Sequence, residues 1–232
     1  MPKQFDHDLC MLEDKLVRMS SMVEEMIANA KKGLSGWDLE PFQANLEIED
    51  QVDAMQGEVD EDTVKLIAVF TPVAKDLRHL LMITKINTEL ERIADQVINI
   101  GFYSKQMFKE PAIKPIVDIP RMTELGREML KEAMESFKNE DKKQAVAVIK
   151  KDDKVDDLHD KVFRDLMVFV QNDPSTLKQA MELILTARSF ERIADHAVNI
   201  AEDVFFMIEG YDIRHETVNG LTNGSDMEDG QK

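Results

Sequence analysis

The sequence is poor in cysteine, in aromatic residues and in turn-forming residues. It has one cysteine, 6% aromatics, nine glycines and seven prolines in 232 residues. The single Cys10 excludes an intramolecular disulfide and argues against thiolate metal sites. Sheet-rich proteins need more aromatic residues and turn glycines, so the composition favours helices. With 43% hydrophobic residues the chain has enough apolar side chains for a core.

Long apolar runs are missing too. No run of 18 apolar residues exists, so we expect no membrane-spanning helix, and the start "MPKQFDHDLC" lacks the apolar stretch of a signal peptide. Acidic residues outnumber basic ones 46 to 29, giving a net charge of -17. That charge argues against binding nucleic acid or an anionic membrane surface directly and is compatible with binding cations. We expect a cytoplasmic protein.

The first half of the chain reads as three long helices. Apolar residues recur every three or four positions over 5–30, which is the pattern of an amphipathic helix in a bundle. "KKGLSGWD" (31–38) ends that helix, with Gly33 as the expected stop. Two further periodic segments, 39–70 and 73–108, are separated by Pro72.

The second half repeats this order after the proline-rich "KEPAIKPIVDIP" (109–120). We expect three more helices, over 121–139, over 141–172 and up to about 209, with Asp173 or Ser175 capping the last one near Pro174. The sequence therefore predicts an all-α fold of six long helices in two similar antiparallel three-helix bundles. The expected divisions are a first bundle over 1–110, a linker over 111–120, a second bundle over 121–210 and a disordered tail over 211–232.

One ten-residue segment occurs twice. "ERIADQVINI" (91–100) and "ERIADHAVNI" (191–200) agree at seven of ten positions, one hundred residues apart. They fall in the third and the sixth predicted helix, so an internal duplication is the simplest account. Each copy has a Glu and an Asp four residues apart, which places both carboxylates on one helix face.

Helical geometry predicts where these carboxylates point. At 100° per residue, Glu91 and Asp95 fall beside the apolar arc of their helix, on its core side, while Glu89 and Arg92 fall on the solvated arc. Glu191 and Asp195 repeat this placement in the second copy, and two further acidic pairs, one in each half, share it. The eight predicted positions are Glu49, Asp53, Glu91 and Asp95 in the first half, and Asp152, Asp156, Glu191 and Asp195 in the second.

The turns between helices predict which pairs meet. In an antiparallel helix pair, residues equally far from the turn lie at the same height. The pairs 49/53 and 91/95 are centred on Pro72, and the pairs 152/156 and 191/195 on Asp173 and Pro174. Four carboxylates at one height, without enough basic residues, are expected to bind cations or take up protons.

Oxygen ligands favour hard cations such as Mg²⁺, Mn²⁺, Ca²⁺ or iron. Four-helix di-iron proteins place a His three residues after a Glu, and none of these Glu residues is followed in that way, which weakens an oxygenase or ferritin-like interpretation. His196 is expected to be structural or on the surface, and His159 is a possible neighbour of the second group. Arg92 and Arg192 form either exposed salt bridges or a contact with phosphate or a partner. No motif indicates catalysis, so we expect no enzyme.

The chain resembles the PhoU family over about residues 5–210. The resemblance rests on three features taken together: the two "ERIAD…NI" segments, the acidic steps (two acidic residues four positions apart) of the second and fifth helices, and "FTPVAKDLRHLL" (70–81). The resemblance implies two three-helix bundles whose acidic steps bind multinuclear metal clusters, with iron, zinc, Mn²⁺ or Mg²⁺ as candidates. By position it carries over to the eight carboxylates named above.

The resemblance also implies a function. Members of the family look like non-enzymatic cytoplasmic adaptors, often dimeric, between the ATPase subunit of a phosphate ABC transporter and a membrane sensor histidine kinase. They restrain phosphate uptake and phosphate-starvation signalling, and they reach the membrane through partners. Two alternatives stay open: a di-metal carboxylate protein for metal storage or oxidation, and a purely structural helical scaffold.

Overall fold

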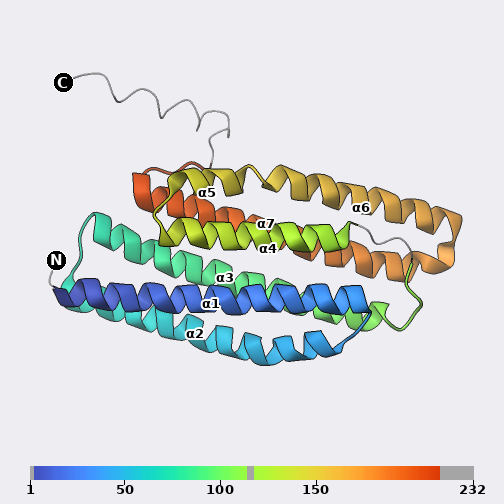
Figure 1. The fold of residues 1–232 in the computed structure, drawn as a ribbon, viewed down its shortest axis with the longest axis horizontal. Coiled ribbons are helices and arrows are strands. Elements are labelled where there is room, and N and C mark those ends of the chain that lie inside the picture. The colour runs from blue at the N-terminus through green and yellow to red at the C-terminus, as the bar shows by residue number, and fades with distance from the viewer. Residues whose placement is uncertain (1–2, 114–117, 215–232) are drawn as a thin grey trace, which may run out of the picture.

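The computed structural model describes residues 3–113 and 118–214, and within these ranges every regular element is a helix (Figure 1). The first half forms α1 (Lys3–Gly36), α2 (Glu40–Phe70) and α3 (Lys75–Met107). The predicted segments 39–70 and 73–108 are confirmed to within two residues. The helix predicted over 5–30 is longer at both ends.

The second half forms α4 (Ile119–Lys138), α5 (Lys142–Ile149), α6 (Asp152–Asn172) and α7 (Leu177–Glu209). One helix was expected over 141–172, but it is interrupted at residues 150–151. A short 3-10 helix, η1 (Pro174–Thr176), precedes α7, and the Asp173 side chain accepts a hydrogen bond from the Ser175 backbone N–H at 3.0 Å. Asp173 therefore caps η1 and not the long helix as predicted, because α7 begins after Thr176, which makes no side-chain cap bond.

The α5–α6 interruption is held against α4 by Lys151. Its Nζ lies 2.7 Å from a carboxylate oxygen of Glu132 and 3.0 Å from one of Glu128. The backbone N–H of Lys151 also bonds the carbonyl of Val148 at 2.9 Å, a three-residue step that tightens the last turn of α5. As a result α6 begins anew at Asp152, whose acidic side chain suits the positive end of the helix dipole.

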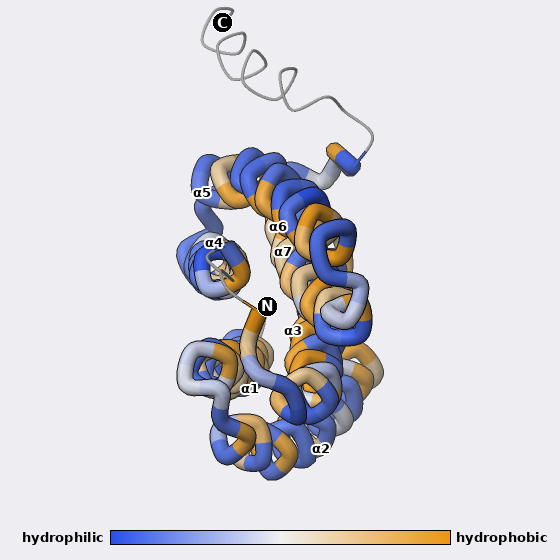
Figure 2. The backbone as a smooth tube through the Cα atoms, turned by 90° about the vertical axis from the view of Figure 1, so that its right-hand side faces the viewer, coloured by the Kyte–Doolittle hydropathy of each residue, from blue (hydrophilic) through white to orange (hydrophobic). Residues whose placement is uncertain are grey.

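The two halves pack side by side, chiefly through α3 and α7 (Figures 1 and 2). These helices run antiparallel, because Lys85 contacts Asp203 while Glu89, further along α3, contacts Asn199. Ala94 and Ala194 are both buried near the middle of these helices, where small side chains allow a close approach. The predicted all-α arrangement of two three-helix bundles is confirmed, with the third position of the second bundle filled by α5 and α6 together.

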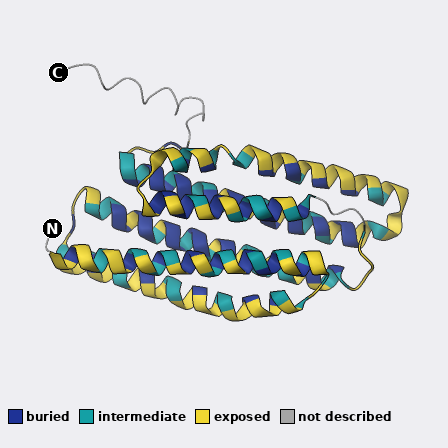
Figure 3. Cartoon of the chain, viewed as in Figure 1, coloured by how far each residue is buried: buried dark blue, intermediate teal, exposed yellow. Residues whose placement is uncertain are grey.

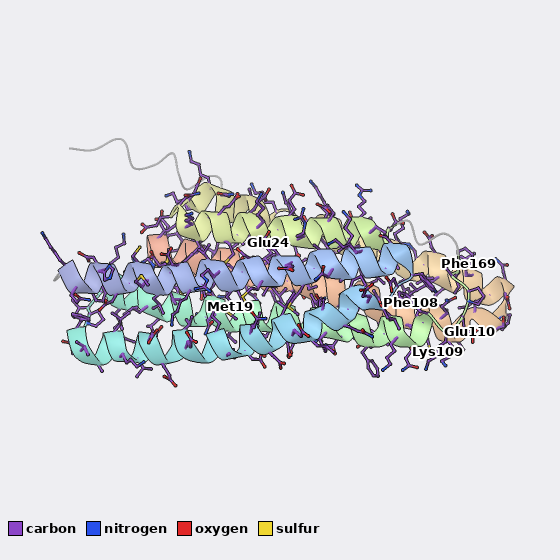
Figure 4. All side chains as sticks on the ribbon, turned by 60° about the horizontal axis from the view of Figure 1, so that its bottom comes forward. Met19, Glu24, Phe108, Lys109, Glu110 and Phe169 are labelled. Atoms are coloured by element: carbon purple, nitrogen blue, oxygen red, sulfur yellow. The ribbon has the colours of Figure 1, made fainter. Side chains whose placement is uncertain are left out.

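A second contact between the halves joins α1 to α4. Lys31 of α1 pairs with Glu124 of α4. Glu24 of α1 lies at the same boundary (Figure 4), where burial raises the pKa of its carboxyl and the charges of Arg127 and Lys131 oppose that rise. Oppositely charged groups therefore face each other across the α1–α4 contact.

Buried residues follow the inward stripe of each helix (Figure 3), so the core runs along both bundles. In α1 the stripe includes Leu16, Met19 and Val23, none of which is exposed. Each such side chain contributes about 1.5–3 kcal/mol by leaving water. At one end of the first bundle Trp37 stacks on Phe108 (labelled in Figure 4) with ring centroids 4.3 Å apart.

Two sequence predictions were wrong in detail. Gly33 does not end α1, which continues to Gly36. A Cβ on Gly33 would lie 2.3 Å from the Phe42 ring, so a glycine is needed for close packing rather than as a stop. The expected tail was set to begin at 211, but Ile213 is buried and Arg214 pairs with Asp203 at 2.9 Å. The rest of that predicted tail, 215–232, lies outside the described residues.

Candidate metal sites

The first acidic cluster consists of Glu49 and Asp53 on α2 with Glu91 and Asp95 on α3. Burial raises the pKa of Glu49, and the charges of Asp53, Asp95 and Glu91 raise it further. The same causes raise the pKa of Glu91, through burial and then Asp95 and Asp53, and that of Asp95, through burial and Asp53. The predicted meeting of the two pairs across the α2–α3 turn is confirmed, whereas metal ligation by these residues stays a prediction.

The cluster lies nearer the surface than predicted. Glu49 and Glu91 are half-buried, but Asp53 and Asp95 are exposed. The apolar residues Leu46 and Val64 of α2 and Leu81 of α3 are also 54%, 65% and 46% exposed. The reason is that α1 covers only one side of the α2–α3 pair, so the wheel's apolar arc continues onto the uncovered side. The carboxylates therefore line an outer face that cations reach from solvent.

The second acidic cluster consists of Asp152 and Asp156 on α6 with Glu191 and Asp195 on α7. Burial, followed by the charges of Asp156 and Asp195, raises the pKa of Asp152 to about 7. Burial also raises the pKa of Glu191, with Asp195 adding to the effect, and that of Asp195, with Asp156 adding to it. The meeting predicted across the α6–α7 turn is confirmed as well.

Asp152 carries the clearest sign of an unmet ligand. Its Oδ1 atom is buried and has no hydrogen-bond partner in the structure. A buried carboxylate oxygen without a partner costs free energy unless a proton or a cation satisfies it. Asp152 sits in the first turn of α6, directly after the α5–α6 interruption.

The second cluster has basic neighbours on α6 and α7. The charge of His159 lowers the pKa of Glu191, opposing the larger effect of burial, and Arg188 acts in the same direction. Arg192 and His196 oppose the raised pKa of Asp195. His159 thus acts on this cluster electrostatically, in line with its predicted approach, although no structural contact makes it a ligand.

The residues fit an oxygen-preferring cation chemically. Both clusters offer only carboxylates, the donors that Mg²⁺, Mn²⁺ and iron prefer and that Zn²⁺ also accepts. Within residues 3–113 and 118–214, no three His, Cys, Asp or Glu side chains are gathered tightly enough to hold one ion as they stand. Burial and, after it, the charges of neighbouring carboxylates raise the pKa values of Glu49 and Asp152, and a bound cation would offset that repulsion.

Sequence reasoning missed a polar network between the halves. Glu89 was placed on the solvated arc of α3, but it is only 9% exposed. Its Oε2 lies 2.6 Å from Nδ1 of His196 and accepts a hydrogen bond from Asn199 at 3.1 Å, while Oε1 pairs with Arg92 at 3.2 Å. Burial raises the pKa of Glu89, but these partners hold it below its usual value.

The error has a simple physical cause. The wheel treats α3 as part of one bundle, so the arc opposite its core looks solvated, whereas α7 of the other bundle covers that arc. The expected structural role of His196 is confirmed by its contact with Glu89. The sequence held one sign that this position differs between the halves: the first copy of the repeat has Gln96 where the second has His196.

None of the helices in the described ranges combines the length and the apolar character that a membrane crossing requires.

A family model described as the PhoU domain matches the chain twice, over residues 16–103 and 119–204. The phosphate-specific transport system accessory protein PhoU homolog of Aquifex aeolicus is 35% identical over 206 residues, covering 89% of this chain and 93% of that protein. The phosphate-specific transport system accessory protein PhoU of Escherichia coli K12 is 29% identical over 228 residues, covering 97% and 95%.

Solved structures agree with these matches. The crystal structure of PhoU from Pseudomonas aeruginosa superposes with a TM-score of 0.86 at 30% identity, covering 89% of this chain and all of that one. The phosphate transport system regulatory protein PhoU from Streptococcus pneumoniae has the same fold, with a TM-score of 0.82 at 21% identity, covering 89% and 98% of the two chains.

Proposed function

Because the chain belongs to the PhoU family, we propose that it is an accessory regulator of phosphate uptake. The observation that carries the proposal is the double match to the PhoU domain, which spans both bundles, together with relatives that are accessory proteins of phosphate-specific transport systems. The protein acts by contacting other proteins, and we assign it no catalytic step.

We propose more specifically that it is a cytoplasmic adaptor. It links the ATPase subunit of a phosphate ABC transporter to a membrane sensor histidine kinase and restrains uptake and starvation signalling when phosphate is plentiful. Its two similar bundles support this role, because they pack together and offer two related but distinct surfaces. A homodimer would present each surface twice, and the membrane would be reached through the partners.

The two acidic clusters are proposed to hold the metal ions of this adaptor. Asp152 supports this assignment most directly, since its unpartnered buried oxygen is where a cation would relieve both burial and repulsion. Glu49, Asp53, Glu91 and Asp95 would hold metal in the first bundle, and Asp156, Glu191 and Asp195 would join Asp152 in the second. A bound ion would supply positive charge that draws the two helices of each pair together.

The regulatory role is tested by deleting the gene in its native host and growing the cells in high phosphate. Loss of restraint predicts that alkaline phosphatase is made despite the phosphate and that its synthesis returns when the gene is restored. Unchanged repression in the deletion strain would contradict the proposal. A pull-down from phosphate-replete cells, read for the transporter ATPase and the kinase, tests the adaptor role separately.

The alternatives make different predictions. A di-metal storage or oxidation protein would consume oxygen after Fe²⁺ addition and develop the absorbance of an oxo-bridged di-iron centre. A purely structural scaffold would show the same melting temperature with and without Mn²⁺, Mg²⁺, Zn²⁺ or iron, because only ligands that bind the native state raise it. We expect metal-dependent stabilisation without oxygen consumption.

A further inference from the structure

Two pockets flank the α3–α7 contact, and their linings are related by the repeat. One, the carboxylate-lined pocket, has a volume of about 320 Å³ and is lined by Lys85, Thr88, Glu89, Arg92, Asn199, Asp203 and Arg214. The other, the arginine pocket, has a volume of about 210 Å³ and is lined by Gln96, Asn99, Tyr103, Leu185, Arg188, Ser189 and Arg192. Six of the seven positions in each correspond at an offset of one hundred residues.

The carboxylate-lined pocket neutralises its own positive charges. Asp203 pairs with Lys85 at 3.3 Å and with Arg214 at 2.9 Å. Glu89 pairs with Arg92 at 3.2 Å. Each cation of this pocket therefore already has a carboxylate, and an anion entering it would have to displace one.

The arginine pocket lacks both of those carboxylates. Ser189 stands where the first copy has Glu89, and Tyr103 stands where the second copy has Asp203. Among the described residues no Asp or Glu lines this pocket, and neither Arg188 nor Arg192 forms a salt bridge within 4.0 Å. Arg188 opposes the raised pKa of Glu191, and Arg192 opposes that of Asp195, through charge alone.

The remaining lining completes a set of hydrogen-bond donors. Gln96 and Asn99 provide side-chain amides from α3, and Tyr103 and Ser189 provide hydroxyls. Two guanidinium groups one helical turn apart match the oxygens of a tetrahedral anion, which they bind through paired N–H donors. The volume admits a small inorganic anion.

We propose that the arginine pocket is a binding site for a tetrahedral oxyanion, with inorganic phosphate as the probe ligand. The proposal does not depend on metal binding, since the lining contains none of the eight candidate ligands. The two pockets occupy corresponding places in the repeat, and only the arginine pocket lacks the two carboxylates that pair with the basic side chains of the other.

The test is a calorimetric titration of the metal-free protein with sodium phosphate in EDTA, with sodium chloride at matched ionic strength as the blank. We expect saturable binding of one phosphate per chain. Arg188→Gln with Arg192→Gln should weaken binding at least about tenfold, because each guanidinium–oxyanion pair contributes a charge-assisted hydrogen bond. Arg92→Gln, the matched change in the carboxylate-lined pocket, should leave the affinity within about twofold of the wild type, since Arg92 lies outside the pocket.

Ser189→Glu sharpens the test by restoring the carboxylate that the first copy has. It should pair with Arg192 as Glu89 pairs with Arg92 and weaken phosphate binding at least about tenfold, whereas Ser189→Ala should change it by about threefold or less. Circular dichroism of each variant confirms that it folds. Heat that chloride reproduces, or equal losses in Arg92→Gln and in the double arginine variant, would overturn the proposal.

Discussion

The first acidic cluster lies on two uninterrupted helices, whereas the second includes a residue at the start of a new helix. Glu49 lies well inside α2, and its counterpart Asp152 opens α6 after the α5–α6 interruption. Both carboxyls have raised pKa values for the same first cause, burial. Only Asp152 combines that burial with an unpartnered oxygen and a pKa of about 7.

Duplication thus kept the four acidic positions in each half but changed the backbone that supports them. A carboxylate on a continuous helix keeps its place beside its neighbours whatever their charge. A carboxylate at a helix start depends on how the preceding turn is anchored, here by Lys151 on α4. We therefore expect two sites of the same chemistry that differ in their response to protons and to changes nearby.

The largest effect should come from removing ligands of one half at a time. Asp53→Asn with Asp95→Asn should lower metal affinity in the first cluster at least about 100-fold, and Asp156→Asn with Asp195→Asn should do so in the second, because each loses half of its carboxylates. Plasma mass spectrometry of the purified proteins should show about half of the wild-type metal in each. Asp50→Asn and Asp157→Asn serve as matched controls, and equal metal in all variants would refute the ligand assignment.

The two clusters should differ in how strongly a lower pH weakens their metal binding. Because burial and repulsion raise the pKa of Asp152 to about 7, a proton competes with metal at pH 6 but much less at pH 8. Mn²⁺ affinity of the second cluster should therefore fall about tenfold between pH 8 and pH 6. The measurement uses the two double variants, each of which keeps one cluster, and a first cluster that loses as much affinity as the second would contradict it.

Asp152→Asn should stabilise the metal-free protein at high pH. The folded pKa of about 7 lies above the ordinary value of 3.8, so the folded state holds the extra proton between these values and stability falls as pH rises through this window. Above pH 7 the folded protein bears the full cost of the ionised Asp152 carboxylate. Removing that charge should raise the free energy of unfolding by about 1 kcal/mol, a value kept small because solvent screens a half-buried group. In EDTA the variant should melt about 2–4 °C higher at pH 8. At pH 4 it should show no gain, and an equal gain at both pH values would rule out this cause.

The smallest effect concerns the two lysines that each tie a helix to its neighbour. Lys15 contacts Glu58 at 2.7 Å and Asp62 at 2.9 Å between α1 and α2, and Lys151 makes two similar contacts with α4. Replacing either by Ala should cost about 0.5–1 kcal/mol in urea unfolding. Only Lys151→Ala should also weaken Mn²⁺ binding in its own half, by about twofold to threefold, because only Lys151 adjoins a cluster residue. Equal Mn²⁺ affinities in the two variants would show that the anchor does not position Asp152.

Much of this arrangement follows from the sequence alone. The three-and-four spacing of apolar residues predicted the helices, and the distances of the acidic pairs from Pro72 and Pro174 predicted which pairs meet. Both kinds of inference are local to one hairpin, where chain geometry fixes heights. The interruption at residues 150–151 was not predictable, since the same segment reads as one amphipathic helix and the contacts of Lys151 with α4 are tertiary.

A helical wheel drawn for one helix also could not predict how one half packs on the other. Glu89 reads as a solvated residue on α3 and is buried only because α7 supplies His196 and Asn199. The same wheel placed the eight carboxylates on the core side, although they line the uncovered face of each hairpin. Burial at a boundary depends on the neighbouring elements, and a repeat in the sequence shows that two halves exist without showing how they pack.

The central claim, that each half carries its own carboxylate metal site, is tested most directly by anomalous diffraction from crystals grown with Mn²⁺. We predict anomalous peaks at two places, one among Glu49, Asp53, Glu91 and Asp95 and one among Asp152, Asp156, Glu191 and Asp195. Peaks confined to other residues, or none at either cluster in Mn²⁺-saturated crystals, would contradict the account.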